Sequence, residues 1–186
     1  MNTTPQDDEH QIIERCRKGD RDAFAVLVDR YQSLAYTVAC RMVGDAETAN
    51  DIAQESFLSA YTGLGHFRFG SKFSSWLTSI VLNKCRDLLR SRRDTVGVDE
   101  IAEIRQTGRR DPEQEAAAGE SGEAVQRALN GLPPDYREVV ILKHIEELDY
   151  QSISEILGVG IPALKVRAHR GREMLRKLLE RSGVRP

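Results

Sequence analysis

The sequence has few aromatic residues and no long hydrophobic run. Aromatic residues make up 6% of the 186 residues, whereas charged residues make up 30%. This composition suits small helical bundles better than a β-sandwich, which needs β-branched and aromatic runs. No apolar stretch approaches the roughly 20 residues of a membrane-spanning helix, and the polar segment 1–10 lacks the features of a secretory signal. We therefore expect a cytoplasmic protein without direct membrane insertion.

Cysteine is also scarce, and the three that occur form no C-x-x-C pair. Cys16, Cys40 and Cys85 are odd in number and far apart, which argues against a disulfide framework or a zinc site. Whether these thiols respond to oxidants stays open, because their exposure is unknown. The sequence also lacks a glycine-rich phosphate loop, a nucleophile elbow and an H-E-x-x-H motif, and its four histidines are scattered. We expect no enzyme activity, no metal and no cofactor.

The small net charge of −2 hides a strong asymmetry. Residues 84–93 read KCRDLLRSRR and residues 165–181 read KVRAHRGREMLRKLLER, with an acidic stretch between them. Two basic patches separated by an acidic connector suggest two cationic surfaces that face one polyanion. The alternative for either patch alone is an ordinary solvated helix face.

Helical periodicity dominates the first half of the chain. We expect helices over 8–17, from the cap Asp20 to Gly44, from the cap Asp45 to about Gly63, and over 73–92. A loop rich in glycine and aromatic residues precedes the fourth helix. The second helix carries an apolar stripe for burial: Phe24, Leu27, Tyr31, Leu34 and Val38.

The second half repeats this helical character after a connector. Residues 96–122 lose the apolar pattern and predict an acidic flexible linker, with a short helical turn near 112–118. Further helices are expected over 124–132, 135–145, 150–157 and 162–181. The predicted fold class is therefore all-α: two small helical domains, 1–95 and 123–186, joined by a flexible linker.

Residues 150–172, YQSISEILGVGIPALKVRAHRGR, have the form of a helix-turn-helix. Pro162 suits the first turn of the second helix, where its missing N–H is harmless. The outer face of that helix predicts duplex DNA contacts, with Arg170 reading guanine and Val166 meeting a thymine methyl. Its predicted contact residues are Ala163, Lys165, Val166, Arg167, His169, Arg170 and Arg172. The alternative is a helical hairpin with a basic outer face.

The first half carries two further candidate surfaces. On the third helix, Asp51, Gln54, Glu55 and Leu58 put a leucine among acidic groups, which suits a basic partner with an apolar notch. An ordinary solvated face is the alternative. The loop HFRFGSKF and the fourth helix combine rings, cations and an amide, which together can hold unstacked bases. The candidates there are Arg68, Phe69, Lys72, Phe73, Trp76, Asn83, Arg86 and Arg90.

Three segments carry a family resemblance: DIAQESFLSAY, HFRFGSKFSSWLTSIVLNKCRDLLRSRR and LNGLPPDYREVVILKHIEELDYQSISEILGV. In order and spacing they resemble the extracytoplasmic-function (ECF) sigma factors of the sigma-70 family, which have only regions 2 and 4. The resemblance implies that the third-helix stripe docks on the clamp helices of RNA polymerase. It implies that residues 69–73 and Asn83 capture a flipped base of the -10 element, and that the last helix reads the -35 element.

The same resemblance implies partners and a role. The partners are core RNA polymerase (clamp helices and flap), promoter DNA and an anti-sigma factor, and the linker threads toward the polymerase active-site channel. The role is transcription initiation at stress or envelope-signal genes. One departure is that residues 162–167 read PALKVR where the family has a run like Gly-Thr-Val-Lys-Ser-Arg, so the -35 contacts become more apolar. The alternative function is a stand-alone helix-turn-helix regulator.

Overall fold

The described parts of the chain are built of helices. The computed structural model describes the backbone of residues 5–95 and 120–182 and the side chains within 8–92 and 122–182. The helices of the first half are α1 (Pro5–Arg17), α2 (Arg21–Val43), α3 (Ala46–Gly63), the short η1 (Leu64–His66) and α4 (Phe73–Thr95). Those of the second half are α7 (Glu120–Asn130), α8 (Pro134–Val140), η2 (Ile141–Ile145), α9 (Tyr150–Leu157) and α10 (Ile161–Arg181). The predicted all-α fold class is confirmed.

Local chemistry explains most of the helix ends. The side chains of Asp20, Asp45 and Asp149 each accept a hydrogen bond from a backbone N–H of the first turn that follows. The N–H of Ala23 contributes most to lowering the pKa of Asp20 below its usual range. Gly44 and Gly158 end α2 and α9 with φ of 78° and 66°, a left-handed conformation that glycine adopts without a Cβ clash.

Two boundaries differ from the sequence prediction. α7 begins at Glu120, so the last residues of the predicted linker are helical, whereas residues 96–119, including the predicted turn near 112–118, lie outside the described part. The helix expected over 135–145 is α-helical only to Val140 and then widens into a π-turn, where Glu146 N–H donates to the Ile141 carbonyl. One turn is too short for hydrophobic periodicity to distinguish these two helix types.

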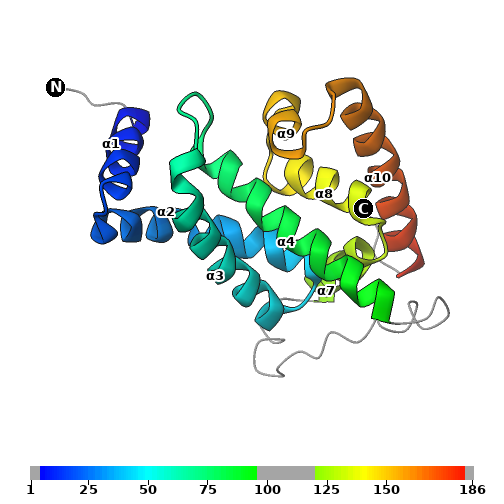
Figure 1. Cartoon of the computed structure of the whole chain (residues 1–186). Helices are drawn as coiled ribbons and strands as arrows, with labels where there is room; N and C mark the ends of the chain where they lie inside the picture. Colours follow the sequence, from blue (N-terminus) through cyan, green and yellow to red (C-terminus); the bar gives the residue numbers. More distant parts are fainter. Residues whose placement is uncertain (1–4, 96–119, 183–186) are drawn as a thin grey trace.

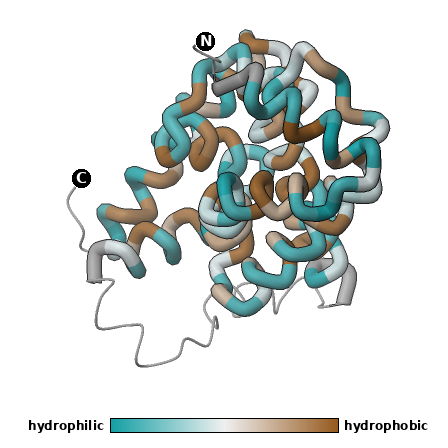
Figure 2. The backbone as a smooth tube through the Cα atoms, turned by 90° about the vertical axis from the view of Figure 1, so that its left-hand side faces the viewer, coloured by the Kyte–Doolittle hydropathy of each residue, from teal (hydrophilic) through white to brown (hydrophobic). Residues whose placement is uncertain are grey.

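The core of the first half lies among α2, α3 and α4. Within the predicted α2 stripe, Phe24, Leu27 and Val38 are buried, and Tyr31 and Leu34 are half-buried against the same core. In Figure 2 hydrophilic and hydrophobic residues interleave along the helices, as amphipathic helices require. The stripe therefore packs as its spacing predicts.

The two halves share one continuous apolar core. In Figure 1, α4 runs diagonally across the molecule with α3 on one side and α8, α9 and α10 on the other; α2 contacts α7 and α8, and α4 contacts α9. Arg137 of α8 is buried and donates to the carbonyls of Met42 in α2, of Asn130 at the end of α7, and of Leu132 just after it. Helical periodicity alone did not predict this contact between the halves.

Candidate nucleic-acid interface

The α3 face stands at the surface with the composition that the sequence suggested. Asp51, Gln54 and Glu55 are exposed, and Leu58 is 65% exposed, the most open of the large apolar side chains in the described part. On the opposite side of α3 the apolar residues Ile52, Ala53, Phe57 and Ala60 enter the core. The four residues that the sequence singled out on α3 therefore lie on its exposed side.

A shallow groove continues this face toward α2. It is lined by residues of both helices, including Val28, Gln32, Tyr36, Asn50 and Gln54. Lys84 of α4 pairs with Glu55 at 3.1 Å, and the Glu55 side chain stays 66% exposed. A basic partner with an apolar notch would find exposed carboxylates and the projecting side chain of Leu58 on this face.

The loop between α3 and α4 divides its aromatic rings between surface and core. Phe69 is 41% exposed, and the cations of Arg68 and Lys72 beside it are exposed. Phe67 and Phe73 are buried, and Trp76 is half-buried with its ring centroid 5.3 Å from that of Phe67.

The burial of Phe73 corrects one predicted site residue. Its ring is fully buried and contacts the rings of Tyr31, Phe67 and Trp76. A nucleotide base therefore has no access to it while α4 stays packed, so Phe73 is a core residue in this structure. Phe69 is the exposed ring of the loop.

The outer side of α4 carries the other predicted base-contacting residues. Asn83 and Arg90 are exposed, and Arg86 is half-buried. An Arg86 nitrogen donates to the amide oxygen of Asn83 at 2.7 Å, and its Nε donates to Glu138 of α8 at 2.8 Å. The guanidinium of Arg86 therefore orients the amide of Asn83.

The predicted reading face of α10 is also at the surface. Ala163, Lys165, His169, Arg170 and Arg172 are exposed, Val166 is 48% exposed, and Arg167 is half-buried. On the inner side Leu164, Ala168 and Gly171 are buried. A Cβ at Gly171 would lie 2.7 Å from a methyl of Val140, so glycine permits the close approach of α10 to α8.

Glu138 is a buried carboxylate that connects the two cationic surfaces, and the sequence did not single it out. Its side chain is 3% exposed and lies 2.8 Å from an Arg86 nitrogen and 3.8 Å from an Arg167 nitrogen. Burial raises the pKa of Glu138, and the charge of Arg86 opposes that shift. A glutamate directly before the apolar run 139–142 was the available signal, but its distant partners are set by tertiary structure.

Among residues 5–95 and 120–182, no helix is long and apolar enough to cross a membrane. Within the same ranges, no group of three or more His, Cys, Asp or Glu side chains is placed to hold a metal ion.

Known proteins resemble this chain along nearly its whole length. The family model for Sigma-70 region 2 matches residues 27–95, and that for Sigma-70 region 4 matches residues 122–175. The ECF RNA polymerase sigma factor SigW of Bacillus subtilis is 38% identical over 177 residues, which cover 90% of this chain and 94% of that protein. The RNA polymerase sigma-H factor of Pseudomonas aeruginosa is 33% identical over 184 residues, covering 94% and 95%.

Solved structures show the same architecture. The sigma factor RpoE, in complex with the anti-sigma factor NepR from Bartonella quintana, superposes with a TM-score of 0.69 and covers 84% of this chain and 96% of its own. At 23% identity that likeness concerns the fold. CnrH, in complex with the cytosolic domain of CnrY, has a TM-score of 0.66 at 28% identity and covers 92% of this chain and 97% of its own.

These relatives favour a sigma factor over a stand-alone regulator. Both family regions occur in the order that the sequence motifs predict, and the relatives match from end to end rather than over the helix-turn-helix alone. The chain therefore belongs to the sigma-70 family, within the extracytoplasmic-function group of RNA polymerase sigma factors.

Proposed function

We propose that this sigma factor recruits core RNA polymerase through α3 and guides it to promoters through two DNA-binding surfaces. The observation that carries the proposal is the exposure of three chemically distinct faces on one chain. They are the α3 face, the loop and outer side of α4, and the outer side of α10. Catalysis is assigned to the polymerase and none to this chain.

The α3 face is the proposed polymerase-docking surface. Asp51, Gln54, Glu55 and Leu58 offer carboxylates around an exposed leucine, and charges at the rim of such a surface steer association. The clamp helices of the polymerase are the proposed partner of this face, and the flap is the proposed partner of the second half.

The loop before α4 and the outer side of α4 are proposed to bind the -10 element as a single strand. Phe69 is the ring on which an extruded base stacks, and Asn83 is the amide that reaches a base edge. Phosphates would meet the nearby cations, and Trp76 borders the site. The proposed cations are Arg68, Lys72, Arg86 and Arg90.

The outer side of α10 is proposed to read the -35 element in the major groove. Lys165, Arg167 and Arg172 bind phosphates, while Arg170 forms a bidentate pair with guanine that contributes about 1–3 kcal/mol of discrimination. Ala163, Val166 and His169 complete the face. The apolar Ala163 and Val166 favour contacts with thymine methyl groups over hydrogen bonds.

The proposed inhibitor is an anti-sigma factor that covers both halves; the solved complex of RpoE with the anti-sigma factor NepR supports a partner of this class. We also propose cytoplasmic location, domains at 1–95 and 123–186 with a connecting linker, and a role at stress or envelope-signal genes.

Run-off transcription tests the central claim. Purified core polymerase is incubated with a pool of promoter fragments, with and without this protein, and specific transcripts are expected only when the protein is added. Reversing two charges, Asp51→Lys with Glu55→Lys, should abolish both polymerase binding and transcription while leaving the helical circular-dichroism signal intact.

A control variant reverses the charge of one exposed glutamate outside α3. Glu155 is exposed on α9, and its carboxylate accepts a hydrogen bond from Gln151 on the same helix. The Glu155→Lys variant should bind polymerase as the wild type does. Polymerase binding by the Asp51/Glu55 variant would refute the docking surface. Absence of transcripts, with tight duplex binding by the protein alone, would indicate a stand-alone regulator instead.

A further inference from the structure

The first helix, α1, contacts the loop that presents Phe69, and it lies before the part of the chain that matches the Sigma-70 region 2 model, residues 27–95. Three α1 side chains, Glu9, His10 and Arg17, reach the segment from Leu64 to Phe73. The sequence assigned no role to this helix. The contacts at the two ends of the loop and at its exposed ring point to one function.

Arg17 holds the start of the loop. Its Nε donates to the Leu64 carbonyl at 3.2 Å, and one of its terminal nitrogens donates to the Phe67 carbonyl. Glu14, one turn earlier on α1, accepts from the other terminal nitrogen at 3.1 Å and orients the guanidinium. The side chain of Arg17 is 23% exposed, so these bonds are partly shielded from water.

The same arginine and His10 hold the exposed ring. The guanidinium carbon of Arg17 lies 4.5 Å from the centroid of the Phe69 ring, within the range of a cation–π contact. His10 meets Phe69 in an edge-on arrangement with centroids 4.9 Å apart. Phe69 therefore has α1 against it while 41% of the residue remains exposed.

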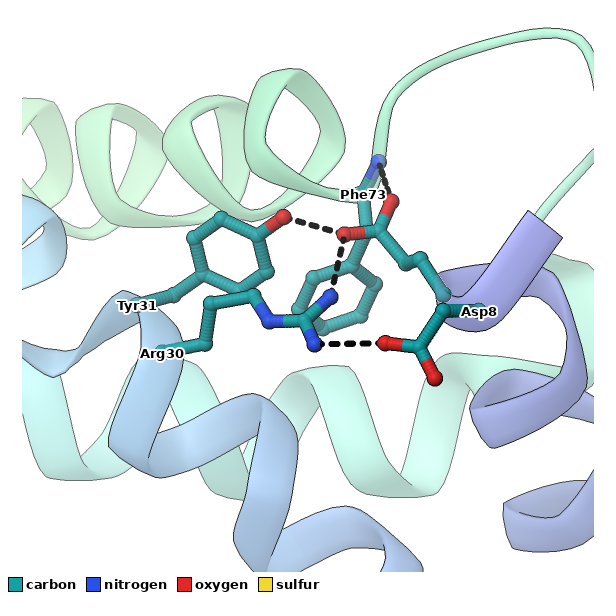
Figure 3. A network of polar contacts seen from close by, with 5 residues as sticks. Asp8, Arg30, Tyr31 and Phe73 are labelled. Atoms are coloured by element: carbon teal, nitrogen blue, oxygen red, sulfur yellow. Dashed lines mark hydrogen bonds and ion pairs between the residues drawn. The ribbon is translucent and has the colours of Figure 1, made fainter. Parts of the chain in front are cut away.

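Glu9 holds the end of the loop. Its buried carboxylate accepts a hydrogen bond from the backbone N–H of Phe73 at 3.4 Å, at the first residue of α4. N–H groups at a helix N-terminus lack partners within the helix, and a negative charge there is favourable. The Tyr31 hydroxyl also donates to Glu9, and Arg30 lies 3.9 Å from it, as the dashed lines of Figure 3 show.

We infer that α1 positions the base-capture loop, with Arg17 and Glu9 as positioning residues and Phe69 as the ring that they present. This inference rests on the proposed function of the loop in binding the -10 strand. A short loop that contains Gly70 at φ +124° has many conformations when unsupported. Ordering the loop before DNA arrives removes an entropy loss that binding would otherwise incur.

The test separates base capture from polymerase binding. The holoenzyme is formed from core polymerase and the full chain, and its affinity is measured for a single-stranded oligonucleotide carrying the -10 element of a promoter mapped by run-off transcription. Affinity for core polymerase is measured in parallel by competition. Arg17→Ala should weaken oligonucleotide binding about three- to tenfold, which is the loss expected from one or two newly mobile side chains. The affinity for core polymerase should stay unchanged.

Matched variants on α1 complete the design. Arg15→Ala removes an arginine that pairs with Asp20 rather than with the loop, and it should leave both affinities at the wild-type value. Arg17→Lys keeps the positive charge and an N–H donor group but loses the planar guanidinium, so it should recover part of the oligonucleotide affinity. His10→Ala removes only the edge-on ring contact, and it should show a smaller loss even if Arg17→Ala fails to fold.

The outcomes distinguish this inference from the proposed function. A wild-type holoenzyme without affinity for the -10 oligonucleotide would refute the proposed function, and the inference with it. If the wild type binds and both Arg17→Ala and His10→Ala bind equally well, the positioning role alone is refuted. If Arg17→Ala lost affinity for core polymerase and for the oligonucleotide equally, the positioning role would also be refuted, because α1 would then support the fold of the whole first half.

Discussion

Replacing Glu138 with glutamine removes a buried negative charge between two cationic surfaces. Two nitrogens of Arg86, each 2.8 Å away, contact one carboxylate oxygen of Glu138, and Arg167 lies 3.8 Å from the other. The side chains of both arginines are 30% exposed, whereas that of Glu138 is 3% exposed. Water therefore weakens the attraction, while the carboxylate bears the full penalty of burial.

The direction of the pKa shift decides the expected stability. Burial is the largest cause and raises the pKa of Glu138 above its usual 4.5, despite the opposing charge of Arg86. The folded state then binds more protons than the unfolded state in this window, so wild-type stability falls as pH rises from 4.5 through the folded pKa. The glutamine variant has no ionisable group at this position, so its stability lacks this dependence on pH.

The size of the stability change depends on the hydrogen bonds that glutamine keeps. Its amide oxygen still accepts from Arg86, so at pH 7.5 we expect Glu138→Gln to be as stable as the wild type or more stable by up to about 1 kcal/mol. For a chain of this size that corresponds to about 2–4 °C in Tm. Glu138→Ala should instead lose about 1–3 kcal/mol, because an arginine N–H loses its acceptor.

Thermal unfolding followed by circular dichroism at pH 4.5 and 7.5 measures these differences. Glu155→Gln, an exposed glutamate on α9, is the control and should match the wild type at both pH values. A fall of several degrees for Glu138→Gln at pH 7.5, absent at pH 4.5, would refute the reasoning. It would mean that the attraction to the arginines exceeds the penalty of burial.

Three further predictions concern packing, a phenol and the thiols. Gly171→Ala should lower the free energy of unfolding by about 1–3 kcal/mol in urea titration, because the new Cβ would lie 2.7 Å from a Val140 methyl. Burial, with the hydrogen bond to a carboxylate, raises the pKa of Tyr31 to about 12, so wild-type stability should fall between pH 10 and 12, and Tyr31→Phe should lack that fall. Burial raises the pKa of Cys85 to about 12, so mass spectrometry after alkylation of the native protein at pH 8 should find it modified more slowly than the half-buried Cys40.

Each of these has a control or a contrary result. Gly160→Ala meets only Pro162 at 3.9 Å and should be nearly neutral; equal losses at both glycines would contradict the packing argument. If the stability of Tyr31→Phe fell equally between pH 10 and 12, other titrating groups would be responsible for that fall. Alkylation of Cys85 at the rate of the unfolded chain would mean that the core around α4 opens readily.

The sequence by itself determined the helices and the two faces of most of them. Helix caps such as Asp20 and Asp45, and glycine ends such as Gly44, act within one turn, so their effect is readable without tertiary structure. The exposed α3 and α10 faces follow from periodicity for the same reason. The motif order also sufficed to identify the family.

Tertiary structure alone decided which residues meet across the fold. Phe69 and Phe73 stand in the same aromatic and basic loop sequence, yet one ring is exposed and the other fills the core, because α4 begins at Phe73 and turns that ring inward. Glu138 contacts Arg86, which lies 52 positions away in the sequence, and Glu9 contacts Phe73, which lies 64 positions away. Such pairings depend on how helices pack rather than on local spacing, so no periodic pattern in the chain encodes them.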